Sequence, residues 1–195
     1  MKYMASERER DVVVVADSTY GWPEDMWLSD PPELFIALGD LHAADVQPLA
    51  EVAPVMGVYG NHDRHGYLDH ERCVDLSQGG AVGVGTIGST RIVGVSGCVK
   101  YKDEPDILFT QSEYAAALDP IIGPVDLLIT HCPPRGCNDH DDPAHEGIDA
   151  LARLVERCAP RLILHGHTYP DPPREQFAGS QVLYVHGCWR GNLVV

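Results

Sequence analysis

Short runs of apolar residues recur along this chain, and each run stops at a polar, glycine-rich or histidine-rich segment. Continuous runs of this kind, without alternating polar positions, are typical of strands buried on both faces. They predict strands at residues 12–16, 34–38, 55–59, 125–130 and 162–165. Apolar positions near helical spacing predict helices at residues 42–52, 110–118 and 146–158.

The remaining apolar segments complete this pattern. Residues 81–96 read as a β-hairpin, and residues 181–187 and 191–195 offer two further strands. Strands that alternate with helices, followed by a hairpin and more such units, predict an α/β protein with two packed sheets flanked by helices. The length of 195 residues suits one domain. We expect that domain at residues 11–195, with residues 1–10 as a flexible N-terminal segment.

Charge and composition limit the partners and the cellular location. The net charge is −15 and there is no basic run, so we expect neither nucleic acid nor an anionic membrane as partner. No apolar run reaches the roughly 20 residues of a membrane helix, and the charged N-terminus lacks the pattern of a signal peptide. We therefore expect a cytoplasmic protein whose six cysteines are reduced, with a zinc-binding pair at Cys132 and Cys137 as an open alternative.

Polar side chains at the strand ends carry the candidate chemistry. In open α/β sheets, binding sites form beyond the carboxyl ends of the strands. Five predicted strands end there in potential metal ligands: Asp17, Asp40, Asn61 with His62, His131 and His167. Each one alone could be a helix cap or a structural histidine. Together, these oxygen and nitrogen donors indicate a pocket for Mn, Fe or Zn.

The order of these residues carries a family resemblance. The motifs are Asp17, Gly39-Asp40, Gly60-Asn61-His62-Asp63, His131-Cys132-Pro133-Pro134 and Gly166-His167. In this order they resemble the calcineurin-like metallophosphoesterases, from residue 12 to about residue 190. The resemblance implies a two-sheet αββα sandwich. It also implies a two-metal site that hydrolyses phosphate esters by attack of a metal-activated hydroxide.

The resemblance also implies a role for each motif residue. Asp40 resembles the carboxylate that bridges both metals, and Asp17 resembles a ligand of the first metal. The remaining ligands of the second metal correspond to Asn61, His131 and His167. His62 resembles the histidine that assists the leaving group, and Asp63 is expected to orient its imidazole.

Two positions depart from the family pattern, and both belong to the first metal. Thr19 and Tyr169 stand where the family has histidines. We therefore expect one tightly bound divalent metal and a second, weak one, with Mn²⁺ favoured because the first site keeps mainly oxygen donors. His165 either replaces a lost ligand or packs in the core.

Few residues bear on the identity of the substrate. Arg64 and Arg135 follow two of the motifs and are candidate contacts for a phosphate, although solvated loop arginines fit the pattern as well. Trp22 and Trp27 follow Asp17 closely, as part of a lid over the site or of the core. A small phosphorylated molecule is the expected substrate, and the sequence predicts no oligomeric state.

Three functions fit these observations. The first is a metal-dependent phosphoesterase that hydrolyses a phosphate monoester or diester. The second is a non-catalytic binding or regulatory protein with a vestigial metal site, and the third is a metal-dependent nuclease. A scaffold does not need the His62-Asp63 pair beside metal ligands, and the acidic charge disfavours a nuclease. The phosphoesterase is therefore the prediction.

Overall fold

The computed structural model describes residues 8–64 and 66–194, which contain two main sheets. The first, sheet A, has the order β13 (Gly187–Val194), β1 (Glu9–Ala16), β2 (Leu34–Ala37), β3 (Val55–Gly57) and β4 (Cys73–Asp75). The second, sheet B, has the order β11 (Gln176–Phe177), β12 (Ser180–Tyr184), β10 (Leu162–His165), β9 (Leu127–Thr130), β6 (Thr90–Val95) and β5 (Val82–Ile87). A small third sheet pairs β7 (Cys98–Val99) with β8 (Leu108–Phe109).

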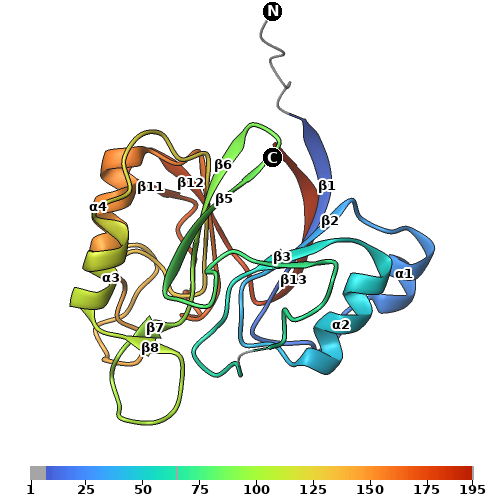
Figure 1. Ribbon diagram of the computed structural model, residues 1–195, viewed down its shortest axis with the longest axis horizontal. Helices are drawn as coiled ribbons and strands as arrows, with labels where there is room; N and C mark the ends of the chain where they lie inside the picture. Colours follow the sequence, from blue (N-terminus) through green and yellow to red (C-terminus); the bar gives the residue numbers. More distant parts are fainter. Residues whose placement is uncertain (1–7, 65, 195) are drawn as a thin grey trace, which may run out of the picture.

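Helices cover the outer face of each main sheet, which gives four layers (Figure 1). On sheet A lie α1 (Glu24–Ser29) and α2 (Ala43–Val52). On sheet B lie α3 (Gln111–Leu118) and α4 (Asp149–Cys158). This arrangement confirms the predicted αββα sandwich.

Strand β1 shows why the apolar runs are continuous. Successive side chains of a strand point to opposite faces of the sheet. Val12 and Val14 pack between the two sheets, and Val13 and Val15 pack against the helical layer of sheet A. Because both faces are covered, all four valines are fully buried, and a polar residue at any of them would face apolar surroundings.

Helices α3 and α4 show two local reasons why these segments form helices. Thr110 and Glu113 form a capping box at the start of α3, with each side chain satisfying a backbone N–H of the other residue. In α4, Leu151, Leu154 and Val155 recur at helical spacing and are all buried in the cluster under sheet B.

The structure confirms the predicted strands, the hairpin and the three predicted helices, with shifted ends. It adds elements that the pattern did not predict: α1, β4, β7, β8 and β11. The strand β1 begins at Glu9, inside the predicted flexible segment, of which residues 1–7 lie outside the described residues. None of the described helices is long and apolar enough to cross a membrane.

The tryptophans after β1 belong to the core. Trp22 and Trp27 are buried, with ring centroids 5.5 Å apart, and Trp27 also packs against Phe35 of β2 at 5.4 Å. The lid alternative is therefore wrong. Burial of these rings also explains how the short helix α1 holds its place without a capping side chain.

The cysteines are free thiols, as predicted. Cys132 and Cys137 are fully buried in the cluster under sheet B, and burial raises the pKa of both thiols. A buried neutral thiol is a poor metal ligand. Within residues 8–64 and 66–194, the side chains that converge in the geometry of a metal site include no cysteine. The zinc-pair alternative therefore has no support.

Candidate metal centre

The carboxyl ends of parallel strands from both sheets meet at one edge of the sandwich. In sheet A, β1, β2 and β3 are parallel, and in sheet B, β9, β10 and β12 are parallel. Backbone hydrogen bonds join the loops that follow: Asp17 donates to the carbonyl of Gly39 at 3.1 Å, and Gly166 to that of His131 at 3.1 Å. The N–H of His167 donates to the Asp17 carboxylate at 3.1 Å, which joins the two sheets.

The motif glycines permit this close approach. A Cβ atom on Gly39 would lie 2.1 Å from the backbone nitrogen of Gly60, and one on Gly60 would lie 2.2 Å from the carboxylate of Asp40. Asp17, Asp40 and His167 themselves adopt left-handed backbone conformations, with φ of 60°, 55° and 71°. Strained conformations of this kind cluster at functional sites, where neighbouring contacts hold them in place.

Three side chains converge as a candidate metal site. Ligand atoms of Asp40, His131 and His167 all lie within 4.8 Å of one another. The Oδ1 of Asn61 lies 3.0 Å from His131 Nε2, so the amide oxygen faces the same point. His131 Nδ1 donates to the carbonyl of Leu38 at 2.8 Å, which leaves Nε2 for a ligand. This donor set, buried and already oriented, fits a divalent cation.

The charges of this group also fit a cation. Burial alone would lower the pKa of His131, but the adjacent Asp40 carboxylate raises it to about 9. Burial opposes ionisation of Asp40, yet the charge of His131 holds the pKa of Asp40 below its usual value. For His167, burial and then the charge of His131 lower the pKa to about 3, so this imidazole is neutral. Without a metal, a buried imidazolium thus stands in for the cation that the carboxylates require.

His62 and Asp63 differ from the expected pair. The Asp63 carboxylate accepts hydrogen bonds from the backbone N–H groups of Asp40, Leu41 and Gly60, at 2.9, 2.7 and 2.7 Å. Through these bonds the carboxylate holds together the loop that carries Asp40 and the loop that carries Asn61. Asp63 therefore does not orient the His62 imidazole.

The carboxylate beside the His62 ring belongs to Asp106. His62 Nδ1 lies 3.4 Å from Asp106 Oδ2, and Lys102 Nζ lies 2.7 Å from the same oxygen. The His62 side chain is 59% exposed, so its ring stands at the mouth of the site with its other face toward solvent. Sequence reasoning missed Asp106, because this residue follows no predicted strand and belongs to none of the motifs.

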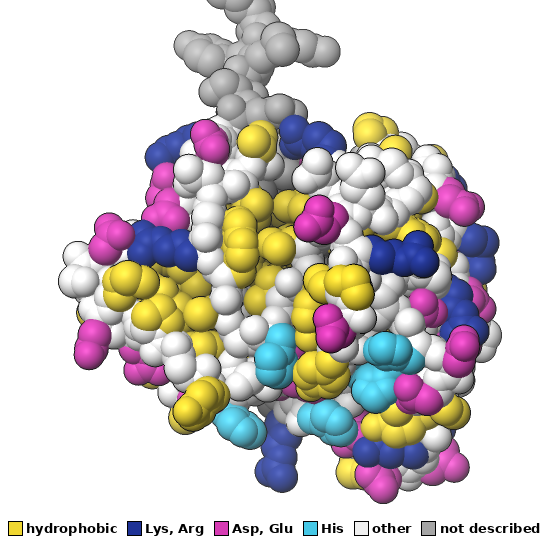
Figure 2. Space-filling model, turned by 180° about the vertical axis from the view of Figure 1, so that it is seen from behind, with side chains coloured by type: hydrophobic (Ala, Val, Ile, Leu, Met, Phe, Trp, Pro, Cys, Tyr) yellow, Lys and Arg dark blue, Asp and Glu magenta, His cyan; other side chains and the backbone are white. Residues whose placement is uncertain are grey.

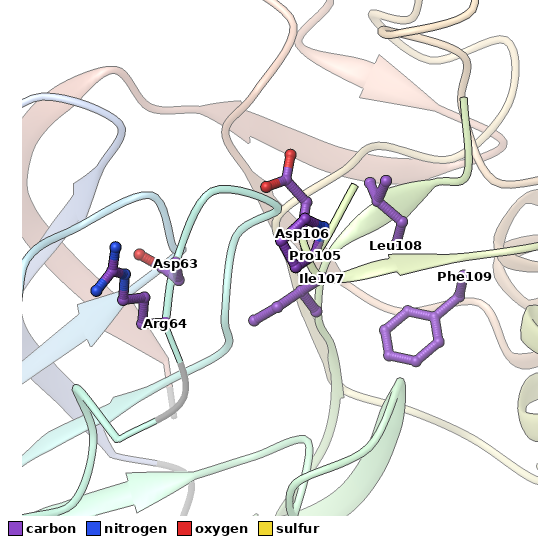
Figure 3. A pocket seen from close by; sticks show the side chains of 7 residues that line it. All are labelled: Asp63, Arg64, Pro105, Asp106, Ile107, Leu108 and Phe109. Carbon is purple, nitrogen blue, oxygen red and sulfur yellow. The ribbon is translucent and has the colours of Figure 1, made fainter. Parts of the chain in front are cut away.

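Two cavities share Asp63 and Arg64, and the larger of them adjoins candidate metal ligands. The larger, of about 710 Å³, is lined by residues that include Asp17, Asp40, His62, Arg64 and Tyr169. The smaller, of about 530 Å³, has Arg64 on one side and Asp106 on the other (Figure 3). The exposed Arg64 therefore lies where it can reach a bound molecule.

Arg135 does not line either cavity. Its guanidinium pairs instead with Asp139 at 3.6 Å and with Glu146 at 3.3 Å, inside its own loop. The two candidate substrate contacts are thus separated, and Arg64 alone of the two faces the cavities.

Known proteins share both the sequence pattern and the fold of this chain. The family model for calcineurin-like phosphoesterases matches residues 11–171. The chain belongs to this family. One solved structure, with a TM-score of 0.64, is 13% identical to this chain, and the match covers 90% of each of the two chains. TT1561 of Thermus thermophilus, with a TM-score of 0.58, is 15% identical and covers 95% of this chain and 99% of its own. No curated protein sequence matches this chain.

In this calcineurin-like phosphoesterase, Tyr169 stands at one of the two positions where the resemblance implies a histidine ligand. Tyr169 is 55% exposed, and its partial burial, together with the nearby Asp17 carboxylate, raises the pKa of the phenol. A neutral phenol is a poor ligand for a divalent ion. Asp17, by contrast, has a side chain only 1% exposed and faces the site.

His165 does not replace a lost ligand. It is fully buried, its Nε2 accepts from Asn138 Nδ2 at 2.8 Å, and its Nδ1 donates to the carbonyl of Gly166 at 3.0 Å. Both ring nitrogens are therefore in use, and burial lowers the pKa of His165 to about 4. The packing alternative is correct for this residue.

A different histidine, His186, lies beside the first site. Its Nδ1 is 3.9 Å from Asp17 Oδ2. The sequence contained a signal for it, because His186 is the next-to-last residue of the predicted strand at residues 181–187, and His131 likewise stands at the end of a predicted strand. Figure 2 shows several histidine side chains gathered on the lower part of one face.

The acidic loop at residues 136–147 packs against the candidate metal site of Asp40, His131 and His167. His167 Nε2 donates to the carbonyl of Ala144 at 2.9 Å, which leaves Nδ1 of that ring for a ligand. His140 Nε2 donates to the carbonyl of Thr168 at 2.5 Å, and the His145 ring lies 5.3 Å from the His167 ring. This loop therefore orients a ligand of the candidate site.

The high pKa of His131 predicts how metal binding depends on pH. A ligand nitrogen must lose its proton before it binds a metal, and this proton remains bound up to about pH 9. Between about pH 6 and 8 the metal affinity should therefore fall about tenfold for each unit of acidification. Calorimetric titration with Mn²⁺ in buffers of different ionisation enthalpy measures this, with about one proton released per ion. An affinity independent of pH would contradict the protonation state assigned to His131.

Proposed function

We propose that this protein hydrolyses a phosphate monoester or diester of a small molecule in a metal-dependent reaction. One observation carries the proposal: the ligand atoms of Asp40, His131 and His167 converge, and Asp40 lines a cavity that His62 and Arg64 also line. Phosphoryl transfer depends mainly on positioning and on neutralisation of charge, so this combination suits it.

Four residues form the proposed tight metal site: Asp40, Asn61, His131 and His167. A divalent cation supplies charge for the phosphoryl oxygens and makes water a stronger nucleophile. His131, held by Leu38, and His167, held by Ala144, present oriented nitrogens. Asp40 and Asn61 present oxygens. These donors suit Mn²⁺, Fe²⁺ or Zn²⁺, and we favour Mn²⁺ because half of the donors are oxygens.

His62 is placed to donate a proton to the leaving group. Its ring lines the cavity, and the Asp106 carboxylate beside Nδ1 orients the ring. In the imidazolium form the Nδ1 proton faces Asp106, and Nε2 carries the proton that passes to the leaving group. Lys102 pairs with Asp106 and holds that carboxylate in place. Asp106 is therefore a positioning residue, and His62 is the proposed general acid.

Arg64 offers a positive charge in a strongly acidic protein. Its guanidinium can contact a phosphate in forked geometry, and the net charge of −15 makes such local charge necessary for an anionic substrate. The same net charge supports a small phosphorylated substrate rather than nucleic acid, and we propose a cytoplasmic site of action.

The first test is metal content followed by turnover. Protein purified without added metal is analysed by elemental analysis, and hydrolysis of bis-nitrophenyl and mononitrophenyl phosphate is then measured with and without Mn²⁺. We expect about one tightly bound metal ion per chain, and turnover that rises on addition of Mn²⁺. Absence of both bound metal and turnover, with Mn²⁺, Fe²⁺ and Zn²⁺ each supplied, would favour a binding protein instead.

A further inference from the structure

The antiparallel pairing of β1 with β13 determines where His186 lies. In that register Ala16 stands opposite Gly187, so the next pair beyond the ladder is Asp17 and His186. Strand β12, which leads to His186, runs parallel to β10, which leads to His167. His186 therefore emerges at the edge where the other strand-end ligands meet, and the main-chain ladders on both sides hold it there.

The distance between His186 and Asp17 allows both side chains to bind one ion. His186 Nδ1 and Asp17 Oδ2 are 3.9 Å apart, which is too long for a hydrogen bond. Two ligand atoms that each lie about 2.0–2.2 Å from one ion can be at most about 4.4 Å apart, so both side chains can reach a shared ion. The Asp17 side chain is 1% exposed and that of His186 is 45% exposed, so an ion between them could enter from the solvent side.

The buried Asp17 carboxylate also lacks a full set of partners. Among the described residues, the hydrogen bonds to this carboxylate come from the backbone N–H of His167, at 3.3 and 3.1 Å. Buried carboxylates are normally paired or bound to a metal. Asp40 lines the same cavity and belongs to the tight site, so a carboxylate shared with a neighbouring ion is at hand.

Tyr169 and Thr19, the other candidate ligands beside Asp17, bind metal ions more weakly than a histidine does. Tyr169 packs edge-on against His186, with ring centroids 5.1 Å apart at 73°, and so flanks the imidazole. An imidazole nitrogen binds Mn²⁺, Fe²⁺ or Zn²⁺ better than a neutral phenol or a threonine hydroxyl does. His186 can thus supply the nitrogen that Thr19 and Tyr169 do not.

We propose that His186, together with Asp17 and Asp40, binds a second metal ion beside the tight site. A histidine from the β12–β13 junction then takes the place of the two missing histidines, and the site is not limited to oxygen donors. This inference rests on the proposed metal-dependent function, but its test reads metal binding and not turnover.

The experiment compares four proteins stripped of metal: the natural chain, His186→Ala, His131→Ala and His70→Ala. His70 pairs with Glu51 outside the site, so it is the matched control. Mn²⁺ is titrated calorimetrically, and electron paramagnetic resonance of the loaded proteins detects coupling between neighbouring ions. We expect two ions and a coupled spectrum for the natural chain and for His70→Ala.

For His186→Ala we expect the first ion to bind with unchanged affinity and the second ion to bind at least about tenfold more weakly. The resonance spectrum should then be that of an isolated ion. Equal binding of two ions by His186→Ala and the natural chain would overturn the role of His186 and leave the proposed function intact. A natural chain that binds a single ion, lost in His131→Ala, would also overturn it. A natural chain that binds no ion would instead overturn the proposed function as well.

Discussion

His131→Ala is expected to lose metal and turnover together. The ring is fully buried, its Nδ1 is fixed by Leu38, and its Nε2 faces Asn61 and Asp40, so no water-exposed side chain can take its place without a rearrangement. Loss of a residue that merely orients a ligand costs about 10–100-fold in metal affinity, and loss of the ligand itself should cost at least about a hundredfold. Elemental analysis and turnover with limiting Mn²⁺ measure both effects.

Removal of a buried ring can also unfold the protein, so the experiment needs a readout of folding. An ion that binds only the folded state stabilises that state by about 2.7 kcal/mol when the free ion concentration is about a hundred times the Kd. Addition of Mn²⁺ should therefore raise the Tm of the natural chain and of His70→Ala but not that of His131→Ala. Normal metal occupancy in folded His131→Ala would contradict the ligand set.

The sequence predicted which candidate ligands follow strands along the chain. Asp17, Asp40 and His131 each stand directly after a continuous apolar run or one residue later, and parallel strands of a sheet place such residues at one edge. Their convergence therefore follows from local pattern and a simple rule of topology. The same rule applied to residues 181–187 would have indicated His186.

Other parts of the site depend on pairings that no local pattern contains. The position of His186 opposite Asp17 requires β13 to close sheet A against β1, across almost the whole chain. The contact between His62 and Asp106 joins two segments that follow different sheets. Asp63 was misassigned because its motif position puts it next to His62 in sequence, whereas its carboxylate turns back to three backbone N–H groups.

His62→Ala is expected to reduce turnover by about 10²–10⁴-fold while metal content stays unchanged. The ring is outside the converging group of Asp40, His131 and His167, and it is more than half exposed, so its removal leaves the ligands in place. A general acid matters most when the leaving group is a poor one. The loss should therefore be large for an alkyl ester and small for a nitrophenyl ester, whose phenolate leaves without a proton.

The roles of His62 and Asp106 can be separated by measurements of kcat. An alkyl and a nitrophenyl ester of the same phosphate are compared on the natural chain, His62→Ala and Asp106→Asn. Asp106→Asn should show the same dependence on the leaving group with a smaller loss, because it disturbs the orientation of the imidazole and keeps the proton donor. A loss in His62→Ala that is equal for both esters would mean that His62 binds substrate and does not protonate the leaving group. Unchanged turnover on the alkyl ester would remove His62 from the mechanism, and the proton would then have to come from the solvent that fills the cavity.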